Sequence, residues 1–439
     1  MTRTLLLFSL FFSGVQAVIA QQILTVDQAI ATALKNNYDI RISRNDSLSY
    51  SIDESYIYTA FLPQLNGTAS KNFTRNQDSL AYRSASRKDT AGLSTSNSLN
   101  FGVRLDWVLF DGMRMFATRD RIRELVKLGD LQVKAQLNNT ISQVLVTYFN
   151  IVQQKQQLNA IIEQKSISEE RVKLADRKLM VGLGAKPELL QAKVDLNAFT
   201  STQYRQNTVI AQLKEQLNQL MGIQSGVTYD VVDSIPINES LTLDEVYKNI
   251  DNSNPELQLA KKNIEISHIG LREIRAGYYP TVSLNSSYNF AQVNNTKNLN
   301  PFALPYRQSG GLVYGLTANI PIFNGFTVNR QLKQARLNIF QQQLQLDNQR
   351  LMMDVAVKNA FRDYELQKQN LVLEEENILL AKENVTIALE RFRLGVSTYI
   401  ELREAQISLN DGYNRLIAAR YNAKVAEVEL MRLKGEILK

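Results

Sequence analysis

The sequence of 439 residues has no cysteine, one histidine (His268), eight prolines and 19 glycines. Without cysteine the chain forms no disulfide, so its stability must come from a packed core or from association with other copies. A single histidine argues against a zinc site and against histidine-based catalysis. The sequence also has no GxSxG or Walker motif. We therefore expect no enzyme, no metal site and no cofactor.

Long hydrophobic runs are also lacking. After residue 20 no segment has eighteen consecutive apolar residues, so if this protein enters a membrane we expect it to do so as strands. Residues 1–20 are typical of a secretory signal peptide, with Arg3 near the start, an apolar core over 5–12 and a small residue, Ala20, at the end. No cysteine follows, so we expect no lipid anchor there. The net charge of +7 is mild and no basic run alternates with aromatics, so nucleic acid is not an expected partner.

What the sequence does contain is an internal repeat. Leu24-Thr25-Val26-Asp27 returns 217 positions later as Leu241-Thr242-Leu243-Asp244, and Phe110-Asp111-Gly112 returns 213 positions later as Phe323-Asn324-Gly325. A register kept over this distance indicates two copies of one architectural unit. We expect a signal peptide over 1–20, a first repeat over 21–222, an inter-repeat equatorial segment over 223–240 and a second repeat over 241–439. Each repeat is expected to hold a helix, two strands and a long helical hairpin.

The expected strands lie at about 64–74, 98–110, 281–293 and 310–323. In the clearest of them, apolar residues from Leu99 to Leu109 alternate with a mostly polar set that runs from Asn100 to Phe110. Strands of about ten residues with one apolar and one polar face are typical of outer-membrane barrels, although a half-buried soluble sheet has the same period. Four strands between very long helices offer no obvious second layer to cover the apolar faces. The polar residues 74–97 are interpreted as a long exposed loop.

The scarcity of glycine and proline indicates long helices around these strands. In the first copy, helical patterns cover about 24–61, 112–180 and 187–220, with a break at Gly182-Leu183-Gly184. In the second copy they cover 327–394 and 399–433, with a break at Gly395. The helix before the first strand and the returning helix together match the long helix in length. We therefore expect these two to stack end to end along it.

A further set of motifs carries a resemblance to a known family. They are Leu241-Thr242-Leu243-Asp244-Glu245, Asn254-Pro255-Glu256-Leu257, Tyr279-Pro280, Ile322-Phe323-Asn324-Gly325, the segment 391–397, Glu401-Leu402 and Ala405-Gln406. In this order, and with the repeat, the chain resembles the TolC family of outer-membrane efflux proteins. The resemblance implies an α+β membrane protein of the Gram-negative outer membrane, with its helical part in the periplasm. It also implies a homotrimer in which four strands per chain form a twelve-stranded β-barrel, continued by a coiled-coil α-helical barrel.

The resemblance places an acidic gate at the turn between the long and the returning helix of the second copy. Alignment on Gly395 puts the gate at Glu401 and Glu404, where the family has two aspartates. In a trimer these carboxylates would crowd one aperture and favour cations. Thr398 and Glu401 also have the spacing of a capping box, and Glu404 is equally explained by a solvated helix face. The first copy has a weaker acidic pair there, Glu188 and Gln191.

Two more groups of residues are candidates for function. By resemblance, the tip that contacts a periplasmic adaptor protein is formed by Val181, Gly182, Leu183, Leu394, Gly395 and Val396. A simple helix-breaking glycine turn explains the same residues. Aromatic residues at strand ends are expected at the membrane interface, with packing at the edge of a sheet as the alternative: Trp107, Phe110, Tyr278, Tyr279 and Phe323.

The function expected from these features is a passive export duct for small molecules such as drugs and toxic compounds. Its expected partners are two further copies, a periplasmic adaptor, an inner-membrane pump of unknown class and outer-membrane lipid. Type I protein secretion and metal-cation efflux are alternatives. No Met or His cluster lines the expected strands or the tip, which argues weakly against export of copper. A soluble coiled-coil scaffold is a remote alternative, which the signal peptide and the alternating strands disfavour.

Overall fold

The computed structural model describes residues 23–82, 88–227, 229–238, 240–299 and 303–437. The expected signal peptide lies outside the described residues. The chain divides into two compact units. One unit is built from the described residues within Met1–Ser43, Val133–Pro255 and Arg350–Lys439, and the other from those within Arg44–Gln132 and Glu256–Gln349.

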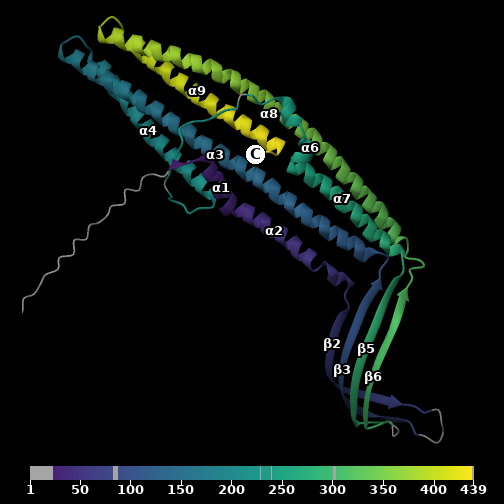
Figure 1. The fold of residues 1–439 in the computed structure, drawn as a ribbon. Coiled ribbons are helices and arrows are strands. Elements are labelled where there is room, and N and C mark those ends of the chain that lie inside the picture. The colour runs from purple at the N-terminus through teal and green to yellow at the C-terminus, as the bar shows by residue number, and fades with distance from the viewer. Residues whose placement is uncertain (1–22, 83–87, 228, 239, 300–302, 438–439) are drawn as a thin grey trace, which may run out of the picture. The chain divides into compact units, whose positions relative to one another are not determined.

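The second of these units contains a four-stranded antiparallel sheet (Figure 1). Its order is β2 (Gln64–Leu80), β3 (Thr90–Phe110), β5 (Thr281–Lys297) and β6 (Tyr306–Asn319). The expected loop over 74–97 is wrong for its described ends, because β2 continues to Leu80 and β3 begins at Thr90. There the strands pair through their backbones, as Asn76 does with Ser94, and a backbone ladder does not need apolar side chains.

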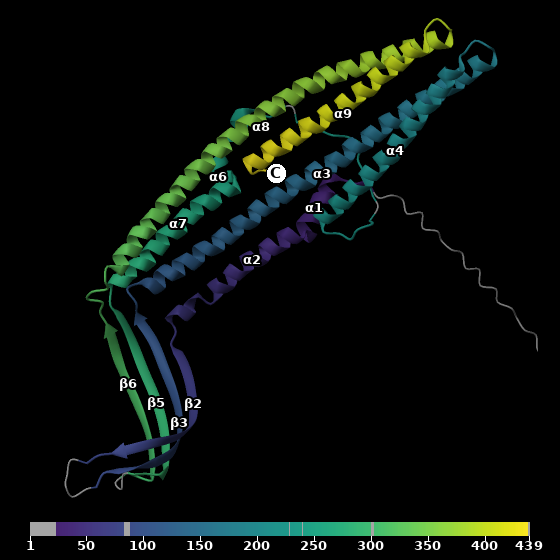
Figure 2. The same cartoon turned by 180° about the vertical axis from the view of Figure 1, so that it is seen from behind.

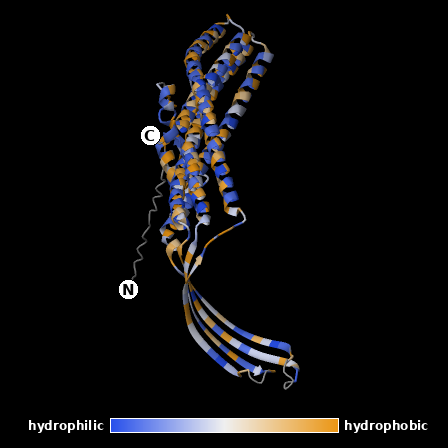
Figure 3. Ribbon diagram, turned by 90° about the vertical axis from the view of Figure 1, so that its right-hand side faces the viewer, coloured by the Kyte–Doolittle hydropathy of each residue, from blue (hydrophilic) through white to orange (hydrophobic). Residues whose placement is uncertain are grey.

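A β-bulge near the end of β3 changes which face one aromatic residue occupies. Trp107 lies opposite Leu284 and Val108 opposite Ser283, but Phe110 is the next residue to pair, opposite Val282. The extra residue, Leu109, returns Phe110 to the face of Trp107. The prediction that Phe110 lies on the polar face of this strand was therefore wrong. Elsewhere the expected alternation is confirmed, and Figure 3 shows hydrophobic and hydrophilic residues alternating along the strands.

The helices have equal lengths in the two halves of the chain. α3 (Arg114–Met180) and α8 (Thr327–Arg393) each have 67 residues, and α4 (Lys186–Met221) and α9 (Tyr399–Lys434) each have 36. The predicted bounds of these four helices are confirmed to within a few residues. On α8 buried side chains recur every seven positions, which is the spacing of coiled-coil packing: Leu371, Ile378, Val385 and Phe392. Among the described helices, none is both long enough and apolar enough to span a membrane.

The helix that precedes each pair of strands is interrupted. Instead of one helix over 24–61, the structure has α1 (Val26–Asn36), α2 (Tyr38–Ser55) and the 3₁₀ turn η1 (Ile57–Phe61). The second half has α5 (Leu243–Tyr247), α6 (Ile250–Ser253), α7 (Pro255–Arg275) and the turn η2 (Ala276–Tyr278). The helices break at Asn37 and Asn254, whose extended backbones cannot continue the helix.

At each break the returning helix ends against the interrupted one. The Asn37 amide donates to the Leu220 carbonyl at 2.8 Å, and the Asn254 amide donates to the Leu433 carbonyl at 2.9 Å. Asn37 also caps α2, since its Oδ1 accepts from the Ile40 amide at 3.1 Å. These contacts place the end of each returning helix at the break in the helix that precedes the strands. The end-to-end stacking along the long helix stays a prediction.

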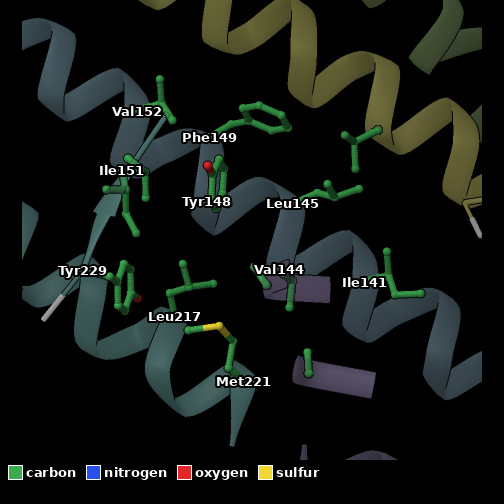
Figure 4. Packing of buried hydrophobic residues seen from close by; sticks show 14 residues of the cluster. Ile141, Val144, Leu145, Tyr148, Phe149, Ile151, Val152, Leu217, Met221 and Tyr229 are labelled. Carbon is green, nitrogen blue, oxygen red and sulfur yellow. The ribbon is translucent and has the colours of Figure 1, made fainter. Parts of the chain in front are cut away.

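The core of the first unit surrounds Tyr148 of α3 (Figure 4), with Val144, Leu217 and Met221 packed beside it. Tyr148 also orders the backbone of the short parallel pair β1 (Ile23–Leu24) and β4 (Asp230–Val231). Its hydroxyl donates to the Leu24 carbonyl at 2.8 Å and accepts from the Val232 amide at 3.2 Å. The start of the described chain is therefore fixed to the same stretch of α3 as the segment between the halves.

Candidate functional site

The candidate site lies in the first unit, at the turns that join α3 to α4 and α8 to α9 (Figure 2). Gly182 and Gly395 take left-handed φ angles of 74° and 78°. The next amide after each glycine reaches back to the helix: Leu183 to the Lys178 carbonyl at 2.8 Å and Val396 to the Arg391 carbonyl at 3.0 Å. Both turns thus have the hydrogen bonds of a Schellman motif. A glycine turn accounts for the local geometry but not for what the turn exposes.

Both turns expose apolar side chains that the chain itself leaves uncovered. Leu183 is 82% exposed and Leu394 is 77% exposed, and Val181 and Val396 are also exposed. Burying such side chains is favourable by about 25 cal/mol per Å² of apolar surface. The turns therefore have the character of a contact surface.

The two turns are connected within the chain by Lys178 and Phe392. The Lys178 ammonium donates to the Phe392 carbonyl at 3.1 Å and lies 3.7 Å from the centre of the Phe392 ring. Phe392 itself is buried with Ala192, Tyr399 and Leu402. This places the end of α3 against the end of α8.

Deeper in the hairpins, a polar cluster joins α3, α4 and α9. Arg171 of α3 is only 2% exposed at its side chain, and its Nη2 lies 2.8 Å from Asp195 Oδ2 of α4. From α9, the Tyr399 hydroxyl donates to the same oxygen at 3.0 Å and Arg403 Nε lies 3.4 Å from it. Arg171 also contacts Tyr399 and donates to Gln406. We call these five residues the latch cluster.

The latch cluster keeps Asp195 ionised. Burial on its own raises the pKa of this carboxyl, but hydrogen bonds from Gln191, Arg171 and Tyr399, with the charge of Arg171, outweigh burial and hold the pKa below its ordinary value. Burial, together with the bond to the Asp195 carboxylate, raises the pKa of the Tyr399 phenol. At neutral pH the cluster therefore contains an anionic Asp195 beside cationic Arg171 and a neutral Tyr399.

The sequence did not single out the latch cluster, although a signal was present. On α3 the buried positions recur at spacings of three and four, which define a helix-packing seam: Ile161, Gln164, Ser168, Arg171 and Ala175. Such a seam is normally apolar, so a charged residue in it needs a buried partner. Arg171 breaks this pattern and therefore indicates a buried partner. The partner, Asp195, is on another helix, so residue spacing along α3 does not identify it.

The expected gate residues Glu401 and Glu404 lie close to the latch cluster but are not part of it. Both are exposed, and Arg403 between them is directed to Asp195. Thr398 caps α9 as expected, because its hydroxyl accepts from the Glu401 amide at 3.2 Å. Among the described residues the Glu401 carboxylate does not return to the Thr398 amide, unlike the complete capping boxes at α1 and α5. The reciprocal half of the expected box was therefore wrong, and the carboxylate is free to face solvent.

The expected interface aromatics gather where the strands meet the helices. Phe110 ends β3, Tyr278 and Tyr279 precede β5, and Phe323 follows the end of β6 at Asn319. Phe323 thus lies beyond its strand, since the expected end at 323 was four residues too long. Trp107 lies within β3, where its Nε1 donates to the Phe61 carbonyl at 2.8 Å.

Comparison with known proteins matches the chain to the family model described as outer membrane efflux protein, over residues 29–223 and 246–436. Protein CyaE of Bordetella pertussis is 27% identical over 364 residues, covering 81% of this chain and 75% of that protein. Outer membrane protein TolC of Escherichia coli is 20% identical over 355 residues, covering 80% and 72%. A crystal structure of a membrane protein from Pseudomonas aeruginosa shares the fold, with a TM-score of 0.76 at 16% identity over 93% of this chain and 90% of that one.

Proposed function

We infer that this chain, which belongs to the outer membrane efflux protein family, is the passive duct of a tripartite efflux system with a gate at the α3–α4 and α8–α9 turns. The single observation that supports a gate is the latch cluster, which joins the two hairpins through charged and hydrogen-bonded side chains. An ion pair between separate helices can break and re-form without unfolding either helix. Such a cluster therefore suits a switch between closed and open arrangements.

We propose that the duct is a homotrimer. Within the described residues, β2 and β6 each have one unpaired edge, and unpaired edges are not tolerated in lipid. Four strands are too few to close a barrel, whereas three copies supply twelve, an even number that leaves a lumen. On α8 an exposed apolar stripe at helical spacing supports packing against a neighbouring copy: Leu337, Phe340 and Leu344.

In this trimer the gate carboxylates would be Glu401 and Glu404. Their exposure, and the engagement of Arg403 with Asp195, support this role, because no neighbouring cation in the latch cluster neutralises them. A ring of such carboxylates favours cations over anions. The latch cluster would hold the helices that carry the ring, and the carboxylates would set the selectivity of the aperture.

The exposed apolar residues of both turns are the proposed contact for a periplasmic adaptor. Val181, Leu183, Leu394 and Val396 project from the two turns, and Gly182 and Gly395 give these turns their sharp geometry. An adaptor that covers these side chains would apply force close to the latch cluster. Binding and opening would then be coupled at one end of the helices.

The chain would supply no energy and catalyse no reaction, so transport depends on an inner-membrane pump. Two relatives from Pseudomonas putida, which are named for solvent efflux and toluene efflux, support small molecules as cargo. Type I protein secretion and metal-cation efflux use a duct of the same kind, and the test below separates them by cargo.

The proposal is tested by export from cells that lack their own outer-membrane efflux duct but produce this chain with its cognate adaptor and pump. We expect the wild type to lower the accumulation of a fluorescent small molecule. The double variant Leu183→Asp/Leu394→Asp should accumulate it, because two charges at the turns oppose an apolar contact. Val227→Asp, at an exposed apolar residue outside the turns, is the matched control. Export of a protein or a metal cation alone by the wild type would overturn the small-molecule assignment, and full export by the double variant would overturn the contact.

A further inference from the structure

A groove of about 420 Å³ lies in the second unit, where β3 leads into α3 and where α7 approaches β5. Its walls are largely apolar and are formed by Phe110, Met113, Phe116, Ala276 and Tyr279. Arg272 and Arg275 of α7 complete it. The groove therefore combines an apolar floor with cationic groups on one side.

The backbone of the β3–α3 turn presents the apolar floor. Gly112 and Met113 both have φ angles of 72°, a left-handed conformation that is rare for methionine. The Asp111 carboxylate stabilises this turn by accepting from the Met115 amide at 3.0 Å. As a result Met113 projects outward and is 58% exposed. Phe116 is held beside it by the ring of Phe61, with ring centres 5.2 Å apart.

The groove opens on the apolar face of the sheet. The bulge at Leu109 places Phe110 opposite Val282, on the face that also carries Leu284. Along α7 and the η2 turn that follows it, the groove uses Arg272, Ala276 and the next residue after the turn, Tyr279. A separate polar groove of about 730 Å³ uses Gly270, Ile274 and Gly277. Residues two positions apart on a helix point about 200° apart. Arg272 therefore lies on the face of α7 opposite to Gly270 and Ile274. Phe110 places the apolar groove on the apolar side of the strands, which is the side that faces lipid in an outer-membrane barrel.

The groove is also remote from the edges of the sheet. β3 and β5 are the inner strands, and β2 and β6 are the edges at which neighbouring copies would join. A trimer would leave a groove beside β3 and β5 uncovered. In the outer membrane, where the helical part is periplasmic, this position is at the periplasmic leaflet.

The two arginines differ in their engagement. Arg272 Nη2 lies 2.8 Å from Asp120 Oδ2, and Arg119 Nη2 lies 3.1 Å from the other oxygen of the same carboxylate, Asp120 Oδ1. Arg275 is exposed, and within the described part of the chain its guanidinium has no ion pair. It is thus the cation available to an incoming anion.

We propose that this groove binds a phospholipid of the periplasmic leaflet. One acyl chain lies along Phe110, Met113 and Tyr279, and the lipid phosphate pairs with Arg275. An apolar floor does not stabilise a free phosphate. In a lipid the acyl chain and the phosphate are adjacent, which matches an apolar floor with an arginine at its side. Arg275 also gives the groove a preference for lipids of net negative charge. The proposal rests on the location in the outer membrane and does not depend on the gate.

The chain offers a built-in probe, because Trp107 is its only tryptophan. Trp107 lies on the same face as Phe110, roughly 10 Å away along β3 at about 3.3 Å per residue. Bromine-labelled lipids quench tryptophan fluorescence on close approach. The full chain would be reconstituted into vesicles that contain brominated phosphatidylglycerol or brominated phosphatidylcholine at increasing mole fraction.

We expect brominated phosphatidylglycerol to quench Trp107 at a mole fraction about fivefold lower than brominated phosphatidylcholine, which is the preference that one interfacial arginine supplies. Arg275→Ala should remove the difference, and Arg275→Lys should retain part of it. Arg336→Ala, at an exposed arginine of α8 outside the groove, should behave as the wild type. Equal quenching by both lipids in the wild type would overturn the proposal, as would an unchanged preference in Arg275→Ala.

A second measurement needs no variant and therefore does not depend on how Arg275→Ala folds. In the wild type, raising the ionic strength to about 1 M shortens the screening length to about 3 Å. The preference for phosphatidylglycerol should then fall toward one, while quenching by both lipids remains because the apolar floor is unaffected. A preference that high salt leaves unchanged would contradict the role of Arg275.

Discussion

Arg171 Nη2 and Asp195 Oδ2 lie 2.8 Å apart between α3 and α4, and both groups are shared with α9 through Tyr399. This pair is the part of the molecule where a buried charge, its partner and a second helical hairpin meet. Removing one member leaves the other buried without its counter-charge, which costs about 3–5 kcal/mol. The pair therefore joins α3 to α4, and its bonds to Tyr399 join this hairpin to α9, only while both members are present.

Asp195→Ala is predicted to loosen the hairpins locally. Arg171 would lose its carboxylate while keeping its contact with Gln406, so the helices should remain folded but separate more often. Hydrogen exchange of the backbone amides over 171–199 and 399–410 should become at least tenfold faster, with the rest of the chain unchanged. Glu188→Ala, a partly exposed carboxylate on α4 outside the cluster, serves as the control. Unchanged exchange in Asp195→Ala would mean that the pair is not holding the hairpins.

The latch cluster should respond to acid only at low pH. Because the folded pKa of Asp195 lies below its ordinary value of 3.8, its stabilising contribution is complete above that value and is lost as the pH falls through the folded pKa. Hydrogen exchange at the turns should thus be flat between about pH 5 and 8, after correction for intrinsic exchange, and should rise below about pH 4. A rise centred near pH 6 would be inconsistent with this assignment.

The joints at Asn37 and Asn254 should each contribute to global stability. Asn37→Ala would leave the Leu220 carbonyl without its donor and α2 without its cap, at a cost of about 1–3 kcal/mol. Asn254→Ala should cost a similar amount through the Leu433 carbonyl. Thermal unfolding compared with Asn207→Ala, at an exposed position of α4, measures the difference. Equal melting of all three variants would show that the joints carry no stability.

Gly222 and Gly182 form a matched pair for separating strain from crowding. Both have left-handed φ angles, of 65° and 74°. A Cβ on Gly222 would meet the Asn36 carbonyl oxygen at 2.4 Å, whereas a Cβ on Gly182 would have nothing within 4 Å. Gly182→Ala should cost only the left-handed penalty of about 1–2 kcal/mol, and Gly222→Ala should cost distinctly more. The order of the two melting temperatures checks this, and the reverse order would refute the crowding at the joint.

Much of the fold could be predicted because long periodic segments leave little ambiguity. The bounds of α3, α4, α8 and α9 follow from apolar spacing between glycine turns, and the strands follow from alternation. The outer ends of β2 and β3 were missed because their pairing is carried by backbone bonds among polar residues. The division into two repeats with a segment over 223–240 between them stays a prediction.

The candidate site was less accessible from sequence. Glu401, Glu404 and the turn residues came from a resemblance, and their roles stay proposals. Arg171 and Asp195 were missed because their contact joins two helices, and sequence spacing reports only neighbours on one helix. The groove beside Phe110 could not be predicted because it depends on the bulge at Leu109. The bulge moves Phe110 to the other face of the strand, and the alternation of apolar and polar residues in the sequence does not reveal it.

Single-channel conductance of the purified protein in a planar bilayer tests the central claim of a gated duct most directly. The wild type should give a small, cation-selective conductance. Asp195→Ala should raise the conductance by loosening the hairpins, and Glu401→Gln/Glu404→Gln should abolish the cation preference by neutralising the ring while leaving the latch cluster intact. A well-folded wild type that forms no channel would contradict the duct itself, and a channel that none of these substitutions changes would contradict a gate at the helical turns.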